Sequence, residues 1–351
     1  MTWLTWRQFR AQAITAVAAL AAFAILLAAT GPHLASLYAT SGLTSCRPAS
    51  CGDQASSWLT QLYSAGTYWV LYLLTIAVIL LAPAVIGLFW GAPLIARELE
   101  TGTAALAWNQ SVTRTRWLAA KLTVGALAAM AVTEGLSLMQ AWWAAPIGRA
   151  VGLGGGGSNL AMGRFSSLVF ATHGITPLGY AAFGFTLGVT AGALIRRTVP
   201  AMAVTLAIFA AAQIAMPLWI RPSLFPAEHT IIPISSLQQI SLQQGGFNSA
   251  SFSLGAENLP GQPGAWLLSS GAVNAAGQAT STTPAACTAR SLRDGSPGFL
   301  QCLASHDIRE AVSYQPVSRY WAFEWTETAI YLAIALALAG CSFWRLSRRL
   351  S

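Results

Sequence analysis

The sequence predicts an all-α integral membrane protein with six membrane-spanning helices, and two observations lead to this fold class. Of the 351 residues, 55% are hydrophobic and only 9% are charged, whereas about a quarter of the residues of a soluble domain are charged. The apolar residues also form long continuous blocks, each close to the roughly 20 residues that a helix needs to cross the hydrocarbon core. Continuous blocks favour helices over the alternating pattern of a transmembrane barrel.

Six blocks have this length and are expected to be the spans. They are Ala13–Thr30, Thr67–Trp90, Leu122–Trp143, Gly174–Ile195, Thr198–Trp219 and Thr326–Trp344. The first block follows Arg7 and Arg10 and ends in small residues, as the core of a cleaved secretory signal does. It is longer than the roughly 7–15 residues of such a core, and five more blocks follow it. An uncleaved first helix is therefore the favoured interpretation.

The basic residues predict the orientation through the positive-inside rule. With a cytoplasmic N-terminus, the short outer loops hold only Arg47, Arg149 and Arg164. The inner side then holds Arg7, Arg10, Arg97, Arg114, Arg116, Lys121, Arg196, Arg197, Arg345, Arg348 and Arg349. Both termini are therefore expected in the cytoplasm. The net charge of +8 suits contact with anionic lipid headgroups, and no nucleic-acid partner is expected.

The chain is expected to divide into an interfacial helix, five spans, an extracytoplasmic domain and a last span with a basic cytoplasmic tail. In the first region Trp3, Trp6 and Phe9 lie near one helical side, which is typical of an amphipathic helix in the membrane interface. The third region is rich in Ser, Gln, Gly and Asn, which predicts a small domain of mixed or irregular structure. The four regions are 1–12, 13–219, 220–325 and 326–351.

Four of the five cysteines lie in the two outer loops of this topology. Because that side of the membrane is oxidising, an even number of cysteines there predicts two disulfides. Pairing within each loop, Cys46 with Cys51 and Cys287 with Cys302, is the simplest of three connectivities. No metal site is expected, since no close pairs of Cys or His ligands accompany them. Cys341, inside the last span, is expected to be a small buried apolar residue.

The most informative segment is the polar inner loop at 95–121, between the second and third spans. It is too polar to lie in the membrane and too short to be a domain, and it carries a tryptophan, Trp108. One interpretation is a short helix below the membrane that docks on a cytoplasmic partner. The other is a solvated loop whose basic residues anchor the next span. The residues alone leave both open.

Several short motifs lie in this loop, at the N-terminus, at the turn between the fourth and fifth spans and before the last span. They are Arg97-Glu98-x-Glu100-x-Gly102-Thr103 with Ser111-Val112-Thr113-Arg114, Trp6-Arg7-Gln8-x-x-Arg10, Arg196-Arg197-Thr198-x-Pro200-Ala201-Met202, and Tyr314-Gln315-Pro316-x-x-Arg319-Tyr320-Trp321. With these motifs the chain resembles type-2 ABC exporter permeases, in a subgroup common in high-GC Gram-positive bacteria. The preference for Arg over Lys suits a GC-rich genome. The resemblance covers the membrane part, and the large outer loop matches only at its edges.

The resemblance implies a permease of the bacterial plasma membrane that is not itself an enzyme. A separate ABC ATPase subunit would bind ATP and Mg²⁺, so no cofactor is expected in this chain, and no G-x-x-x-x-G-K-[ST] phosphate loop occurs in it. A second permease copy, identical or a sister subunit, would complete the transport path, and membrane lipid is a further partner. The inner loop would be the coupling helix. The residues that would couple to the ATPase are Arg97, Glu98, Glu100, Gly102, Thr103, Trp108, Asn109, Gln110, Arg114, Arg196 and Arg197.

Acidic residues in and beside the spans are the other candidate sites. Glu134 lies near the middle of the third span, where an ionised carboxylate is costly. It is either part of the substrate path or dimer seam, or a structural hydrogen-bonded carboxyl. Glu324 and Glu327 either line an outer mouth of the path or are solvated loop charges, and the second interpretation is favoured.

Small residues recur on the fourth span at a spacing of four, at Gly184, Gly188 and Gly192. This spacing lets helices approach closely, so packing is the favoured role and a gating hinge the alternative.

Three classes of function remain at this stage. The favoured one is export of a hydrophobic or amphipathic substrate, such as a drug, lipid or peptide. An alternative is an ATPase-linked sensor or immunity subunit whose extracytoplasmic domain binds a ligand. An intramembrane enzyme is a remote alternative, because the motifs H-E-x-x-H and G-x-S-x-G are absent from the sequence.

Overall fold

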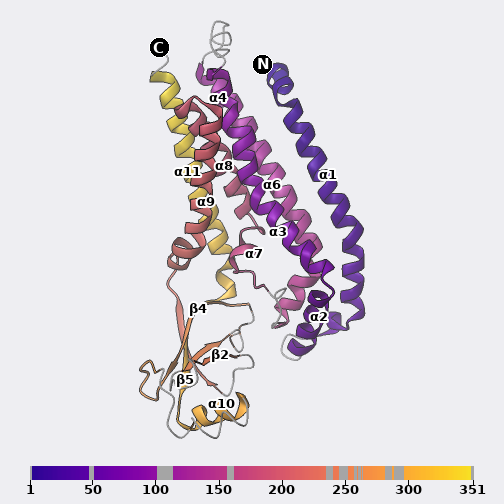
Figure 1. Ribbon diagram of the computed structural model, residues 1–351, viewed down its shortest axis with the longest axis vertical. Helices are drawn as coiled ribbons and strands as arrows, with labels where there is room; N and C mark the ends of the chain where they lie inside the picture. Colours follow the sequence, from indigo (N-terminus) through magenta and orange to yellow (C-terminus); the bar gives the residue numbers. More distant parts are fainter. Residues whose placement is uncertain are drawn as a thin grey trace.

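The protein is an elongated helical bundle with small β-sheets at one end, as shown by a computed structural model (Figure 1). Both ends of the described chain lie at the opposite end of the bundle. We call these two ends the sheet end and the terminal end. The model describes residues 2–46, 51–100, 114–155, 162–234, 240–244, 252–256, 259, 262, 264–280, 287 and 296–348.

Six helices of the described chain are long and apolar enough to cross a membrane, which confirms the predicted number and a multi-pass membrane protein. They cover Gln12–Thr40, Thr67–Glu98, Arg116–Gly152, Thr176–Ile195, Thr198–Ser223 and Val317–Arg345. Most are longer than the apolar blocks, because the helical backbone continues through the polar residues at their ends. The last span begins well before the predicted residue, Thr326.

The spans correspond to α1 (Thr2–Thr40), α3 (Thr67–Ile86) with α4 (Ala92–Glu100), α6 (Arg114–Gly152), α8 (Thr176–Ile195), α9 (Thr198–Ala215) and α11 (Tyr320–Arg348). One π-helical turn, η2 (Gly87–Gly91), joins α3 to α4. Another, η3 (Met216–Ile220), follows α9 and is continued by a short 3₁₀ turn, η4 (Arg221–Ser223).

The first helix differs from the predicted arrangement of an interfacial helix followed by a span. Residues 2–40 form one continuous helix, α1, without a break near residue 12. A separate interfacial helix is therefore not confirmed, and the side chains of Trp3, Trp6 and Phe9 lie outside the described residues. Figure 1 shows α1 at the margin of the bundle.

The fourth span, α8, is the central helix. In its most apolar window 83% of the residues are buried within the chain, against 17% for α1. It packs on α3, η2, α4, α6, α9 and α11. Since the other spans gather around it, α8 defines the core of the membrane part.

Glycines make this central packing possible. A methyl group built on Gly184 would lie 2.7 Å from the carbonyl oxygen of Pro83, and one on Gly192 would lie 2.5 Å from that of Ala92. A methyl group on Gly188 would overlap the carbonyl oxygen of Gly87. The backbones of α8 and of the second span are thus in direct contact, which supports the packing role for the glycine repeat.

The sheet end contains two small antiparallel sheets with strand orders β1-β5-β4 and β2-β3. The strands are β1 (Glu228–Pro233), β2 (Ile240–Gln244), β3 (Phe252–Ala256), β4 (Trp266–Val273) and β5 (Arg309–Gln315). Strand β1 follows the fifth span and β5 leads into the sixth, and they pair from Glu228 with Tyr314 to Pro233 with Arg309. The sheet is therefore a direct continuation of two spans, and it adds strands to the predicted all-α fold.

Short helices and two disulfides complete this end. The helices are α2 (Gly52–Ser64), α7 (Ser167–Phe170) and α10 (Ser296–Ser305). The disulfides Cys46–Cys51 and Cys287–Cys302 confirm the predicted pairing. Cys341 is exposed on α11, so the expectation that this chain buries it was wrong.

Replacement of Gly188 by alanine is expected to disrupt the bundle, because the added methyl group overlaps backbone that cannot move independently. Overpacking of this kind costs about 1–3 kcal/mol or more. Gly148→Ala is the matched control, since nothing lies within 4 Å of a methyl group there. The thermal midpoint of the detergent-solubilised protein should fall for Gly188→Ala and hold or rise for Gly148→Ala. Equal midpoints would show that α8 is not packed as described.

Candidate functional site

At the terminal end, a charged pair joins the two helices that flank the inner loop. Lys121 Nζ of α6 lies 2.5 Å from Glu98 Oε1 of α4, and the ammonium group also lies 4.3 Å from the centre of the Trp117 ring. Lys121 is only 3% exposed. A buried ammonium group requires a partner, so this pair fixes the end of α4 against the start of α6.

A second acidic residue of α4 reaches the turn between the fourth and fifth spans. Glu100 Oε2 accepts hydrogen bonds from Thr198 Oγ1 at 2.8 Å and from Thr198 N at 3.3 Å. Thr198 begins α9, and a carboxylate at the N-terminus of a helix stabilises it through the free N–H groups and the helix dipole. Arg196, which ends α8 in the left-handed conformation with φ of 60°, and Arg197 are both exposed beside this contact.

At the sheet end, a buried ion pair joins the fifth and sixth spans. Arg221 Nε and Nη2 donate to the two carboxylate oxygens of Glu327 at 2.8 and 3.0 Å, and Tyr180 of α8 donates to Glu327 Oε1 at 2.5 Å. The side chains of Arg221 and Glu327 are 1% and 0% exposed. The guanidinium group also lies 4.0 Å from the centre of the Phe170 ring. Three spans and α7 therefore meet at one charged pair.

A second buried carboxylate, Glu324, caps the central helix. Its Oε2 accepts hydrogen bonds from the backbone N–H groups of Ile175 and Thr176 and from Thr176 Oγ1, at 2.9, 3.2 and 2.8 Å. Its Oε1 accepts one from Tyr320 at 2.7 Å. Because the first N–H groups of a helix lack partners within it, Glu324 of α11 satisfies the N-terminus of α8.

Aromatic and polar contacts continue from these carboxylates into the sheet. Phe165, Phe170, Tyr320 and Phe323 form a buried cluster, and Trp266 of β4 stacks on Phe165 with ring centres 5.7 Å apart. The polar contacts beside this cluster are Gln315 Nε2 to the Phe225 carbonyl at 2.8 Å and Arg319 Nη2 to Glu228 Oε1 at 2.9 Å. The sheet is thus packed directly on the ends of the fifth and sixth spans.

A family model described as ABC-2 membrane transporter related matches residues 17–221, which is more than half of the chain. The chain belongs to this family. The match begins within the first span, runs through the inner loop and ends at Arg221 in the fifth span, so it leaves out the sheet and the last span. ABC-2 permeases pair in general with an ABC ATPase. No curated protein and no solved structure matches the chain.

The inner-loop residues on which the sequence resemblance rests are only partly described. Gly102, Thr103, Trp108, Asn109 and Gln110 lie outside the described residues, as does the side chain of Arg114. The side chain of Arg97 is exposed at the end of α4. The structure therefore brings Glu98 together with Lys121, and Glu100 together with the turn at Arg196 and Arg197. These residues lie where the inner loop leaves the bundle.

The favoured interpretation of Glu324 and Glu327 as solvated loop charges was wrong. Both are fully buried, because the helix of the last span begins before them and carries them into the bundle. The sequence reasoning also missed Arg221, which it assigned to the outer loop. The signal was present: Glu324 and Glu327 are three residues apart, on one side of a helix, and Arg221 directly follows an apolar block.

Glu134 differs from the other acidic residues of the spans in its surroundings. It is half-buried on α6, and its Oε2 is buried without a hydrogen-bond partner among the described residues. A structural hydrogen-bonded carboxyl is thus not supported for that oxygen. A role in the substrate path remains a proposal.

Two histidines, His306 and His173, were compared with the requirements of a metal ligand and of a group that titrates near pH 7. His306 Nδ1 lies 3.8 Å from Cys287 Sγ, but that sulfur is joined to Cys302 and is not a thiolate ligand. Burial lowers the pKa of His173 below its ordinary value, which favours the neutral ring near pH 7. His173 Nδ1 lies 3.0 Å from the Val169 carbonyl, which is typical of a structural histidine.

Removal of one member of the Arg221–Glu327 pair should destabilise the bundle strongly, because the other charge would be left buried. The expected loss for Arg221→Met or Glu327→Gln alone is about 3–5 kcal/mol, and the double variant should lose less than the sum. Thermal unfolding of the solubilised protein measures both.

The control for this cycle is Arg309→Gln, which breaks the pair of Arg309 with Asp307, whose side chains are 48% and 59% exposed. Such a pair contributes at most about 1 kcal/mol. Single variants of the buried pair that are as stable as Arg309→Gln would contradict the network.

Proposed function

We propose that the chain is the membrane-spanning permease subunit of an ATP-driven exporter. A separate ABC ATPase subunit would bind ATP and Mg²⁺, and this chain would convert the closure of that subunit into movement of a hydrophobic or amphipathic substrate, such as a drug, lipid or peptide. The observation that carries the proposal is the match to the ABC-2 family over residues 17–221, which spans five of the six membrane helices.

The inner loop at 95–121 is the coupling element of this proposal. The Glu98–Lys121 pair ties α4 to α6, and the Glu100–Thr198 contact ties α4 to α9. A displacement of the loop would therefore be transmitted to α4, α6 and α9, which all contact α8. The exposed Arg196–Arg197 turn is a second surface for the ATPase, since Glu100 holds it next to the loop.

In this proposal the terminal end faces the cytoplasm of a bacterial cell and the sheet end lies outside. Basic residues are concentrated at the terminal end, as the positive-inside rule requires. Both disulfides lie at the sheet end, and disulfides form and persist in oxidising compartments. These two independent observations favour the same orientation.

The transport path would be completed by a second copy of the chain or by a sister subunit. The central helix α8 is enclosed by its own chain, with 83% of its apolar window buried, so it does not line an open path along one protomer. Spans α1, α9 and α11 are the least buried, at 17%, 22% and 28%. They have the free surface that a second copy requires.

Two other functions are retained as alternatives. The direct continuity of β1 and β5 with the last two spans favours, as the runner-up, an ATPase-linked sensor or immunity subunit that transmits ligand binding from the sheet. ATP-dependent movement of a solute into vesicles that hold both subunits would separate export from sensing. An intramembrane enzyme is the remote alternative, because Glu324 and Glu327 are engaged in hydrogen bonds and ion pairs.

The coupling proposal predicts that loop variants uncouple the ATPase. Trp108→Ala removes an aromatic anchor, which at an interface is worth about 2 kcal/mol or more. Glu98→Ala releases the start of α6 and misplaces the loop. Both variants should reduce co-purification of the ATPase subunit or separate its ATP hydrolysis from transport, while membrane insertion stays intact.

The control is Glu134→Gln, which should leave the ATPase bound and change transport or its substrate range. If both loop variants keep the complex and its coupled turnover, the loop is a solvated connector and the coupling proposal fails.

A further inference from the structure

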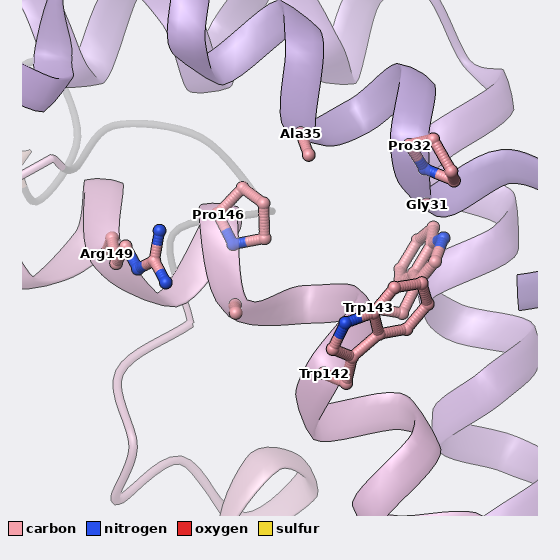
Figure 2. Close-up of a pocket in the computed structure, with 8 residues that line it drawn as sticks. Gly31, Pro32, Ala35, Trp142, Trp143, Pro146 and Arg149 are labelled. Atoms are coloured by element: carbon pink, nitrogen blue, oxygen red, sulfur yellow. The ribbon is translucent and has the colours of Figure 1, made fainter. Parts of the chain in front are cut away.

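A groove of about 180 Å³ opens between α1 and α6 near the sheet end, away from the residues considered so far. Figure 2 shows Pro32 and Ala35 on α1 opposite Trp142 and Pro146 on α6. The lining consists almost entirely of apolar side chains and glycine. Trp142 is 58% exposed, so the groove opens to the surface that the membrane surrounds.

Both helices that line the groove carry a proline inside them. Pro32 lies within α1 and Pro146 within α6, and an interior proline removes a helical hydrogen bond and bends the helix. On the side toward the membrane centre the helices are held together, since Trp143 Nε1 donates to Thr30 Oγ1 at 2.9 Å. The groove is therefore a fixed opening between two joined helices.

Gly31 shows how closely the floor of the groove is packed. A methyl group on this residue would lie 2.9 Å from the Trp142 ring. The indole is thus seated against the backbone of α1 and forms an apolar wall. Tryptophan in such a position is typical of the level at which the hydrocarbon meets the headgroups.

The size of the groove limits what it can hold. A cavity of about 150 Å³ accepts a molecule such as benzene, whereas a pocket for a drug-sized ligand has about 300–1,000 Å³. The groove therefore fits a segment of a molecule whose remainder stays in the bilayer. A lipid acyl chain has this property.

Among the described residues that line the groove, Arg149 carries the one charge. Arg149 is exposed and lies seven residues beyond Trp142, which is about 10 Å along the helix. Figure 2 shows its guanidinium group beside Pro146, at the far end of the groove from the tryptophans. Arg149 has no ion pair with any described residue. The chain thus places a cation at headgroup level above an apolar groove.

We infer that this groove binds one anionic phospholipid from the leaflet at the sheet end. One acyl chain lies against Pro32 and Trp142, and the phosphate group pairs with Arg149. The charge selects an anionic headgroup over a zwitterionic one, and the apolar lining selects a lipid over free phosphate. The site is separate from the coupling loop, so the inference goes beyond the proposed function and does not depend on it.

The test is native mass spectrometry of the full chain in detergent, with phosphatidylglycerol and phosphatidylcholine of identical acyl chains. The wild-type protein should prefer phosphatidylglycerol. Arg149→Gln should reduce that preference about fivefold, the change expected when one basic residue at an anionic surface is lost. Ala35→Trp should fill the groove and lower the occupancy of both lipids.

Matched controls separate a change within the groove from the loss of any exposed arginine or the addition of any indole on α1. Arg164→Gln removes an exposed arginine at the same end but outside the groove lining, and Ala39→Trp adds an indole one turn along α1. Both should bind as the wild type does. The thermal midpoints of all four variants and an intact Cys46–Cys51 disulfide show that each is folded.

A photoreactive acyl chain provides the second measurement and maps the site. Crosslinks of phosphatidylglycerol to peptides that hold Pro32 or Trp142, lost in Ala35→Trp, support the inference. Unchanged headgroup preference in Arg149→Gln, or equal labelling in Ala35→Trp and Ala39→Trp, overturns it. A change of oligomeric state with lipid binding unaltered also overturns it and assigns the groove to a second copy. Loss of ATPase binding would concern the proposed function only.

Discussion

The direct backbone contact between α8 and the second span is the constraint on which the rest of the structure depends. At Gly184, Gly188 and Gly192 no side chain separates the two helices, so α8 can lie at the centre of a bundle built from only six spans. In lipid, helices gain no hydrophobic stabilisation from association with each other, and close van der Waals packing replaces it. A central helix with larger residues would push the surrounding spans apart.

Charged contacts at both ends hold this central unit in one register. At the sheet end Glu324 caps α8 and Glu327 holds Arg221, and at the terminal end Glu98 and Glu100 hold α6 and α9. An ion pair buried on all sides tolerates little displacement, because separation of its members leaves a bare charge in a medium of low polarity. The spans around α8 and the sheet that continues from them therefore form one stiff body. In the proposed function, such a body would transmit a displacement from the inner loop to the opposite side of the membrane.

Much of this architecture could be predicted from the sequence, but the ends of the helices and the buried charged contacts between them could not. Long apolar blocks predicted six spans because hydrophobic length is a direct requirement of the bilayer, and the cysteine spacing predicted both disulfides. Helix ends were misplaced, because a helix continues through polar residues when other spans satisfy them. For that reason the sequence favours a solvated Glu327 and an Arg221 in the outer loop, whereas both side chains are buried. The sequence predicts only a small domain of mixed or irregular structure at this end, because the strands are as short as five residues and Ser-, Gln- and Gly-rich segments separate them.

Spin-label distance measurements test the central claim of a stiff coupling body most directly. Labels replace Val199 at the terminal end and Ala275 at the sheet end, both exposed, in a Cys341→Ser background with the proposed partner ATPase bound. When nucleotide closes the ATPase, the distance from residue 199 to residue 275 within one chain should stay constant. The distances between copies should change at both ends. A change within one chain, or unchanged distances between copies through the ATP cycle, would contradict the account.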